Sequence, residues 1–347
     1  MKIAILFQSQ PPPMKDGIQK PMKSGGYSDS GADIAYCLKQ NGINLITPTE
    51  NPQAINDYDW VFPDSTKGIE AALTRGADTF WLNTVLYENH PIEAFFNEGI
   101  RIIGQAPSQV DLHDDKIVTN RMLADHGISI PAHFIIEKLN ELESVNTKLP
   151  FPMVVKPVRG RGSQGVSIVK DGEELLSKVK LLLDSGNYGR SVYVEQFLSG
   201  KEITITVMPP GRYLIHQKEQ IFQNHWSLPP VERFNHIDGI APYNGTVAVV
   251  DNSRVLLESG AHIQQIKQEC EKAAALVNAK APIRIDCRAD EQGVYHLFDL
   301  NMKPNMTGAS RVHRSDQDSL TMIAAREIGW TYFDLLSNMI QQRWKTA

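Results

Sequence analysis

Short apolar runs alternate with amphipathic stretches through the first third of the chain. The runs that predict buried strands lie at residues 2–7, 43–47, 60–63, 79–83 and 101–104. The stretches whose apolar positions recur at helical spacing lie at about residues 30–40, 67–75 and 91–97. A loop rich in Pro, Gly and Ser separates the first strand from the first helix. This β-α-β order predicts a parallel sheet with helices on both faces.

The pattern changes after Pro107, which marks a predicted domain boundary. A small α+β unit is expected next. Its predicted helices lie at about residues 114–126, 139–146 and 172–185, and its predicted strands at 133–136, 152–157, 166–170 and 192–197. A glycine-rich loop separates the second strand from the third.

The last part of the chain predicts strands at 202–208 and 212–217, a helix at about 258–278, a hairpin at 283–301 and two C-terminal helices. We therefore expect three domains, at residues 1–107, 108–198 and 199–347. A loop of about 25 residues at 221–245 is long for a plain connection and is typical of a lid. His225, Trp226, Arg233 and His236 lie in it and are candidates for contact with a substrate.

Polar residues alternate with apolar ones in the predicted hairpin. Strand geometry places Arg284, Asp286 and Arg288 on one face, opposite Ile283, Ile285 and Cys287. The turn at 290–293 brings Asp286 near Asp299, with Asn301 on the same face. Two carboxylates and an amide oxygen suit Mg²⁺, which takes its other ligands from substrate phosphates. The alternative is a polar outer face with a cross-strand Arg–Asp pair.

Residues 160–165 fit the pattern GxGxxG, which alone is a weak signal. The loop joins two strands, so it is a hairpin flap rather than a dinucleotide fingerprint. Flap glycines allow backbone N–H groups to approach phosphates closely, although an ordinary flexible hairpin tip has the same composition. Lys156, Arg159 and Arg161 near the flap favour phosphate binding. For Lys156 the alternative is a lysine that extends its ammonium group to solvent.

Composition excludes several classes of protein. The chain has 347 residues, a net charge of −5 and no dense basic run, so a dedicated nucleic-acid binder is not expected. The three cysteines form no CxxC pair, which argues against disulfides and structural zinc. No signal peptide or membrane span is predicted, and we expect a cytoplasmic protein without membrane contact.

Several of these motifs together resemble the ATP-grasp superfamily, and within it the D-alanine–D-alanine ligase group. The resemblance covers roughly residues 108–340, and its motifs are specific only as a set. They are Lys116, residues 154–157 with the glycine flap, residues 195–198 followed by Glu202, residues 284–286, and residues 299–301. Residues 301–307 resemble that group's Asn-x-x-Pro-Gly-Met-Thr segment, and Ser310 falls on its later serine.

The resemblance implies an α/β (α+β) ATP-grasp fold, in which two α+β domains clamp ATP beside an N-terminal parallel α/β domain. It also implies a role for each matching residue. The implied ATP-binding residues are Lys116, Lys156, Ser163, Gly165, Glu195, Gln196, Phe197, Leu198 and Glu202. The implied ligands of Mg²⁺, or of Mn²⁺ in its place, are Asp286, Asp299 and Asn301. The implied catalytic residues are Arg284, Lys156 and Ser310.

The chain departs from this group at the expected substrate site. Gly25-Gly26-Tyr27 stands where the group has a glutamate for the amine of the first D-alanine, and Gly162 replaces a substrate-orienting serine. Asp299 replaces a metal-binding glutamate. These departures predict that the substrate differs from D-alanine. Arg311, His313 and Arg314 are candidates for binding a substrate carboxylate.

The resulting hypothesis is an ATP-dependent ligase that joins a small-molecule carboxylate to an amine, with amino acids as substrates. A D-alanine–D-alanine ligase is one alternative. A nucleotide-binding regulator without catalysis is another, but retention of the metal-ligand set argues against it. Related ligases are often dimers, so the resemblance also implies a homodimer.

Overall fold

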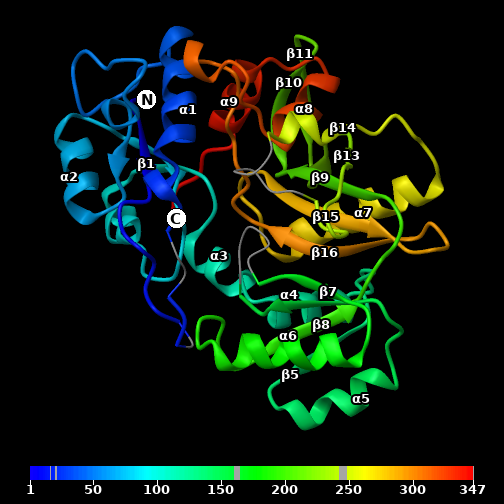
Figure 1. Ribbon diagram of the computed structural model, residues 1–347. Coiled ribbons are helices and arrows are strands. Elements are labelled where there is room, and N and C mark those ends of the chain that lie inside the picture. The colour runs from blue at the N-terminus through cyan, green and yellow to red at the C-terminus, as the bar shows by residue number, and fades with distance from the viewer. Residues whose placement is uncertain (16, 20–21, 160–164, 242–247, 347) are drawn as a thin grey trace.

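The computed structural model describes residues 1–346 except 16, 20–21, 160–164 and 242–247. It has three lobes (Figure 1). The N-terminal lobe holds a parallel sheet in the order β2-β1-β3-β4. Its strands are β1 (Ile3–Phe7), β2 (Phe62–Pro63), β3 (Thr79–Asn83) and β4 (Arg101–Ile103). Its helices are α1 (Ser28–Gln40), α2 (Thr66–Thr74) and the 3-10 helices η1 (Ser24–Tyr27), η2 (Asp57–Asp59) and η3 (Pro91–Glu98).

The predicted parallel sheet is therefore confirmed, but two elements differ from expectation. Residues 43–47 form no strand, and only Leu45 bridges Ile3. Pro48 follows at once, and a residue without an N–H group cannot extend a ladder. The segment predicted as a helix at 91–97 is the 3-10 helix η3.

The middle lobe is built on an antiparallel sheet in the order β5-β8-β6-β7. Its strands are β5 (His133–Ile136), β6 (Met153–Pro157), β7 (Ser167–Val169) and β8 (Val192–Gln196), and its helices are α3 (Pro107–His113), α4 (Lys116–Asp125), η4 (Leu139–Glu141), α5 (Leu142–Asn146) and α6 (Gly172–Asp184). Residues from Ile136 to Val194 pack into a hydrophobic core of their own. The region predicted as one helix at 114–126 is divided, because Asp115 caps a new helix by accepting from Ile117 N and Val118 N.

The third lobe is built on an antiparallel sheet in the order β14-β13-β9-β15-β16, with β12 also pairing with β9. Its strands are β9 (Glu202–Met208), β12 (Trp226–Ser227), β13 (Val231–Arg233), β14 (Ser253–Val255), β15 (Ile283–Ala289) and β16 (Tyr295–Asn301), with the hairpin β10 (Gly211–Ile215) and β11 (Lys218–Phe222) beside it. Its helices are α7 (Ala261–Leu276), α8 (Leu320–Glu327), α9 (Tyr332–Gln341), η5 (Val249–Asp251) and η6 (Val312–Arg314).

The predicted lid at 221–245 is wrong in its first half. The end of β11, then β12 and β13, occupy it, and the last two pair with β9. Strands of two and three residues separated by Pro229 and Pro230 give too short a pattern to recognise. His225 contacts the Ala279 carbonyl, and Trp226 stacks on Phe222; neither lines the two cavities described below.

The N-terminal and third lobes share two hydrophobic cores. Alternate residues of β1 point to opposite faces of the sheet: Ala4 and Leu6 belong to the core that also contains α7, and Ile3 and Ile5 to the core that contains α8 and α9. Near the C-terminus, Trp344 forms a bridge with Ile102 at the edge strand β4. Among helices of the described residues, none combines the length and the apolar character that crossing a membrane requires.

A buried cluster of charges also joins these two lobes. Arg311 is fully buried, and its guanidinium donates to Asp33 of α1 (2.8 Å), to Asp57 (2.6 Å) and to two backbone carbonyls. Arg314 and the Thr307 hydroxyl donate to the same Asp33 carboxylate. Arg311 and Arg314, considered as substrate binders from sequence, thus bind the protein's own carboxylates. His313, between them, lies in no cavity lining.

We predict that Arg311→Met lowers the free energy of unfolding by about 3–5 kcal/mol, because it leaves a buried carboxylate without its main counterion. Urea unfolding followed by tryptophan fluorescence and circular dichroism measures this. Arg254→Met is the matched control, since Arg254 also pairs with a carboxylate but its side chain is 68% exposed. Equal effects of the two substitutions would contradict the prediction.

Candidate active site

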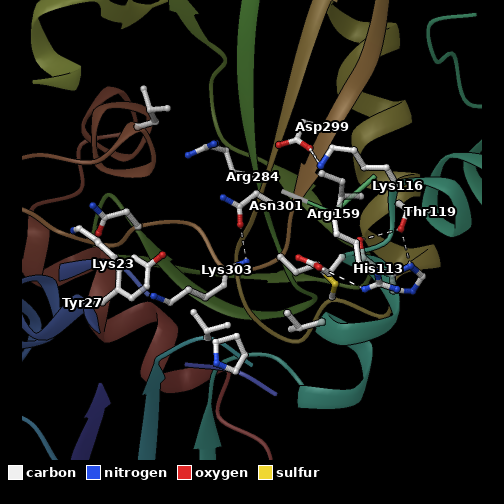
Figure 2. A pocket seen from close by; sticks show the side chains of 18 of the residues that line it. Lys23, Tyr27, His113, Lys116, Thr119, Arg159, Arg284, Asp299, Asn301 and Lys303 are labelled. Atoms are coloured by element: carbon white, nitrogen blue, oxygen red, sulfur yellow. Dashed lines mark hydrogen bonds and ion pairs between the residues drawn. The ribbon is translucent and has the colours of Figure 1, made fainter. Parts of the chain in front are cut away.

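Two cavities meet where the three lobes converge. The large cavity has a volume of about 440 Å³ and the narrow cavity about 160 Å³. Both are lined by Lys116, Arg233, Arg284, Phe298 and Asp299. The narrow cavity lies between β6, β7 and β8 of the middle lobe and β15 and β16 of the third. The large cavity extends from there to the start of α1 (Figure 2).

The hairpin of β15 and β16 supplies the polar residues at the junction. Its register pairs Arg284 with Asn301 and Asp286 with Asp299, which confirms the predicted juxtaposition. Arg284 donates to both oxygens of Asp286 at 3.1 Å. Since Ile285 and its neighbours on the other face are fully buried in the core, the strand's alternation directs the polar face to the cavities.

These residues fit a Mg²⁺ ion. Among the described residues, no three His, Cys, Asp or Glu side chains are grouped to hold a metal by themselves. The set is two carboxylates and the Asn301 amide, which leaves the remaining positions to phosphate oxygens and water, as Mg²⁺ prefers. The roles of Asp286, Asp299 and Asn301 as ligands stay a prediction.

Cations hold Asp299 in its ionised form. Burial alone raises the pKa of this carboxyl, but the ammonium groups of Lys116, 3.2 Å away, and Lys156 lower it, so that the net pKa lies below the ordinary value. The carboxylate is thus charged at neutral pH and ready to bind a cation. Lys116, at the first position of α4, provides its counterion in this state of the protein.

Lys156 lies in β6 with only 4% of its surface exposed, so it does not extend to solvent. Its ammonium donates to Glu195 of β8 at 2.6 Å and to the Phe298 carbonyl at 3.2 Å. Burial raises the pKa of Glu195 in spite of Lys156. The second carboxylate oxygen of Glu195, Oε2, is buried and has no hydrogen-bond partner among the described residues. A hydrogen-bond donor on a bound ligand would satisfy this oxygen atom.

The remaining walls of the narrow cavity are apolar or come from the segment after β8. Val154, Val166 and Ile168 line it from the strands around the flap, and Gln196, Phe197 and Leu198 line it at the edge. Such a slot accepts a flat aromatic group edge-on to a backbone segment. The predicted nucleotide residues Glu195 to Leu198 and Glu202 all lie in this lining.

A loop covers this cavity from the third lobe. His236 contacts the Glu202 carboxylate at 2.8 Å, and Arg288 donates to the Gly239 carbonyl at 2.7 Å. Gly239, Ile240 and Ala241 line the cavity. Of the four lid residues named from sequence, Arg233 and His236 are therefore the two near the site.

Two predicted residues lie outside both cavity linings, and a third is not described by the structure. Ser163 falls outside the described residues. Gly165 has φ +72° and lies against Pro157, where a Cβ atom would come within 2.9 Å of the proline ring, but it is in neither lining. Ser310 donates its hydroxyl to the Asp33 carbonyl at 3.1 Å and also lies outside both linings. Their roles stay predictions.

The large cavity has lining residues that sequence reasoning missed. Lys23, Tyr27 and Lys303 line one end, and His113 and Thr119 line the other (Figure 2). Lys303 lies in the segment 301–307 at a position that the Asn-x-x-Pro motif leaves unspecified. Tyr27 stands in the segment 25–27, where the resemblance places a substrate-binding residue, but its contact with Lys303 depends on the fold.

Residues 122–341 match the family described as D-ala D-ala ligase C-terminus. This match spans more than half of the chain, and the chain belongs to this family. Similar proteins include the D-alanine–D-alanine ligases of Parabacteroides distasonis, 28% identical over 67% of this chain and 64% of that protein, and Francisella philomiragia, 23% identical over 70% of this chain and 72% of that protein. The chain thus spans less than two thirds of the first relative.

Two solved structures show the same fold. The D-alanine–D-alanine ligase from Bacillus anthracis complexed with ATP has a TM-score of 0.64 and 17% identity, over 99% of this chain and 96% of that one. The VanG D-Ala:D-Ser ligase from Enterococcus faecalis has a TM-score of 0.65 and 16% identity, over 98% of each chain. This likeness confirms the ATP-grasp fold class expected from the sequence.

We predict that Lys156→Met destabilises the protein by about 3–5 kcal/mol at neutral pH, because Glu195 loses its buried counterion. A raised carboxyl pKa in the folded state means that stability falls as pH rises above the unfolded value, so the loss grows with pH. The double variant Lys156→Met/Glu195→Leu removes both charges and recovers most of the stability. Urea unfolding at mildly acidic and mildly alkaline pH measures both effects; a pH-independent loss would contradict the assignment.

Proposed function

We propose that the chain is an ATP-dependent carboxylate–amine ligase that acts through an acyl phosphate. The observation that carries this proposal is the pairing of Arg284, Asp286, Asp299 and Asn301 across the β15–β16 hairpin, at the junction of an apolar slot and a larger polar cavity. One cavity suits a nucleotide and the other a substrate, and the junction is where a phosphoryl group would pass between them.

In this proposal ATP lies in the narrow cavity. The Oε2 atom of Glu195 accepts a hydrogen bond from an amino group of the base, and Glu202 accepts from the ribose hydroxyls. Lys116, Lys156 and Arg284 neutralise phosphate oxygens. Asp286, Asp299 and Asn301 would hold Mg²⁺, which would supply charge stabilisation at the phosphates.

The proposed reaction has two steps. A substrate carboxylate oxygen attacks the γ-phosphorus and ADP leaves, giving an acyl phosphate. The nitrogen of an amine then attacks the acyl carbon, loses a proton and expels inorganic phosphate. Arg284, at the junction, stabilises the negative charge that builds up in both steps. The loop around Gly239 limits the access of water to the acyl phosphate.

A second candidate is a D-alanine–D-alanine ligase. The family match and the names of the similar proteins favour it. The chemistry at the junction is the same in both cases, so the two candidates differ only in which substrates the large cavity accepts.

We predict that the wild-type protein releases ADP only when a pair of amino acids is present. Asp299→Asn should lower the rate of ADP release by about 100-fold or more, because the charge on the transferring phosphoryl group is no longer balanced. A coupled ADP assay with amino acids singly and in pairs, and mass analysis of products, measures this. Asp184→Asn, at the end of the distant helix α6, is the control. D-alanyl-D-alanine as the preferred product would select the second candidate. ADP release that survives Asp299→Asn would overturn the ligase proposal.

We also predict that His236→Ala tightens ATP binding by about 5-fold, because His236 occupies the Glu202 carboxylate that the ribose needs and a hydrogen bond is worth about 1 kcal/mol. Calorimetric titration measures the dissociation constant. An ATP analogue without ribose hydroxyls should show no such gain. Weaker ATP binding in the variant would mean that His236 helps to hold the nucleotide.

A further inference from the structure

Two lysines and a tyrosine form one end of the large cavity. The ammonium of Lys303 lies 3.6 Å from the centre of the Tyr27 ring, and that of Lys23 lies 5.2 Å from it. Figure 2 shows this group, the lysine–tyrosine wall, at the opposite end of the cavity from Lys116 and Arg159. All three residues of the wall line the large cavity and none lines the narrow one. The wall therefore belongs to the substrate side.

The Tyr27 ring is held in place by an unusual backbone. Gly25, Gly26 and Tyr27 have φ values of 73°, 56° and 67°, and a tyrosine rarely adopts this left-handed conformation. A Cβ atom on Gly26 would lie 1.8 Å from the Gln8 carbonyl oxygen, so only glycine fits there. The Asn83 amide donates to the Tyr27 carbonyl at 2.9 Å. Strain of this kind persists where surrounding contacts impose it, and it is concentrated at functional sites.

Lys303 is fixed close to the reaction centre. Its backbone N–H donates to the side-chain oxygen of Asn301 at 2.9 Å, and Asn301 lies opposite Arg284 in the hairpin. The Lys303 ammonium nitrogen is shielded from solvent. An anion that enters the cavity would meet an ammonium group that has already lost its water. This strengthens the attraction between the two charges, and because the Lys303 side chain is already in position, little entropy is lost in ordering it.

Cationic side chains outnumber carboxylates in the lining of the large cavity. Its described lining contains six cationic side chains (Lys23, Lys116, Arg159, Arg233, Arg284 and Lys303) and two carboxylates (Asp114 and Asp299). Lys116 and Arg159 each pair with a nearby carboxylate at the nucleotide side. A triphosphate whose charge is balanced by magnesium ions adds little net negative charge. At the lysine–tyrosine wall, Lys23 pairs with Asp29 at 3.4 Å, and the Lys303 ammonium is a second cation beside the same ring.

We propose, on the basis of the ligase function proposed above, that one of the two substrates carries a second carboxylate, which Lys303 and Lys23 bind beside the Tyr27 ring. The carboxylate that becomes the acyl phosphate must lie at Arg284 and the metal ligands, so an anionic group at the lysine–tyrosine wall must be a second one. An acidic amino acid supplies both groups. The ammonium group of a neutral amino acid placed at this wall would face two lysines.

The test compares acidic amino acids with their neutral amides of the same shape, aspartate with asparagine and glutamate with glutamine, in both enantiomers. The wild-type protein should show a kcat/KM for ADP release at least about 10-fold higher with an acid than with its amide, since a hydrogen bond to a charged group contributes about 1.5–3 kcal/mol. A kcat/KM that is equal or higher for the amides would overturn the proposal.

Lys303→Met should raise KM for the acidic substrate by about 10-fold or more and leave kcat/KM for the amide nearly unchanged. Lys23→Met, at a side chain that is 44% exposed and paired with Asp29, should act in the same direction but less. Lys180→Met, on the solvent face of α6, is the matched control. Equal losses for acid and amide in Lys303→Met would mean a structural role and would overturn the proposal.

Two measurements separate the possible failures. ATP affinity and thermal unfolding of each variant report whether it is folded; if Lys303→Met is unfolded, the wild-type comparison and Lys23→Met decide. If the wild-type protein releases ADP with neutral amino acids and shows no preference for acids, this inference fails and the ligase proposal stands. If it releases no ADP with any pair, the ligase proposal itself fails.

Discussion

The buried ion pair between Asp33 and Arg311 fixes the geometry on which the site depends. It ties α1 to the segment that follows β16, and Thr307 and Arg314 bind the same carboxylate. Tyr27 directly precedes α1, and the segment after β16 carries Lys303, so this charge cluster helps to set how the two residues meet at one end of the large cavity. A fully buried guanidinium is stable only when all its hydrogen-bond and charge partners are in place. The two lobes are therefore held in one specific arrangement.

The residues proposed to bind phosphate and metal are paired with one another inside the protein. Lys116 neutralises Asp299, Arg284 neutralises Asp286, and Lys156 neutralises Glu195. Each cation that would bind an anionic ligand thus has a local counterion, and each carboxylate that would bind a metal has a local cation. In the proposed function, a nucleotide with its metal would replace these pairs by equivalent ones. The site can therefore stay charged and closely packed before its ligand arrives, without leaving an isolated buried charge.

The alternation of polar and apolar residues along the chain was enough to predict which side chains meet at the junction of the two cavities. The alternation in residues 283–289 and a recognisable turn determine the cross-strand pairs, since register follows from which face is buried. It was not enough for Arg311, Tyr27 or the short strands β12 and β13. The sequence alone does not show whether a charged side chain points into the protein or to solvent, and most charged side chains are exposed. Arg311 is buried because Asp33 and Asp57, more than 250 positions away, converge on it. The left-handed backbone at Tyr27 likewise depends on Asn83 and Gln8.

The family match covers almost all of the lining of the narrow cavity but only part of the lining of the large cavity. Apart from Lys116, the residues that line the narrow cavity fall within the family match at 122–341. The large cavity also takes residues from before that region, among them Lys23, Tyr27 and His113. Similarity in the matched region therefore supports shared chemistry at the junction, because most of the groups proposed to bind phosphate lie there. It says little about the substrate, because one side of the substrate cavity is built from chain outside the match. The ammonium groups of Lys303 and Lys23, and not the names of the relatives, are the physical basis for proposing an acidic substrate.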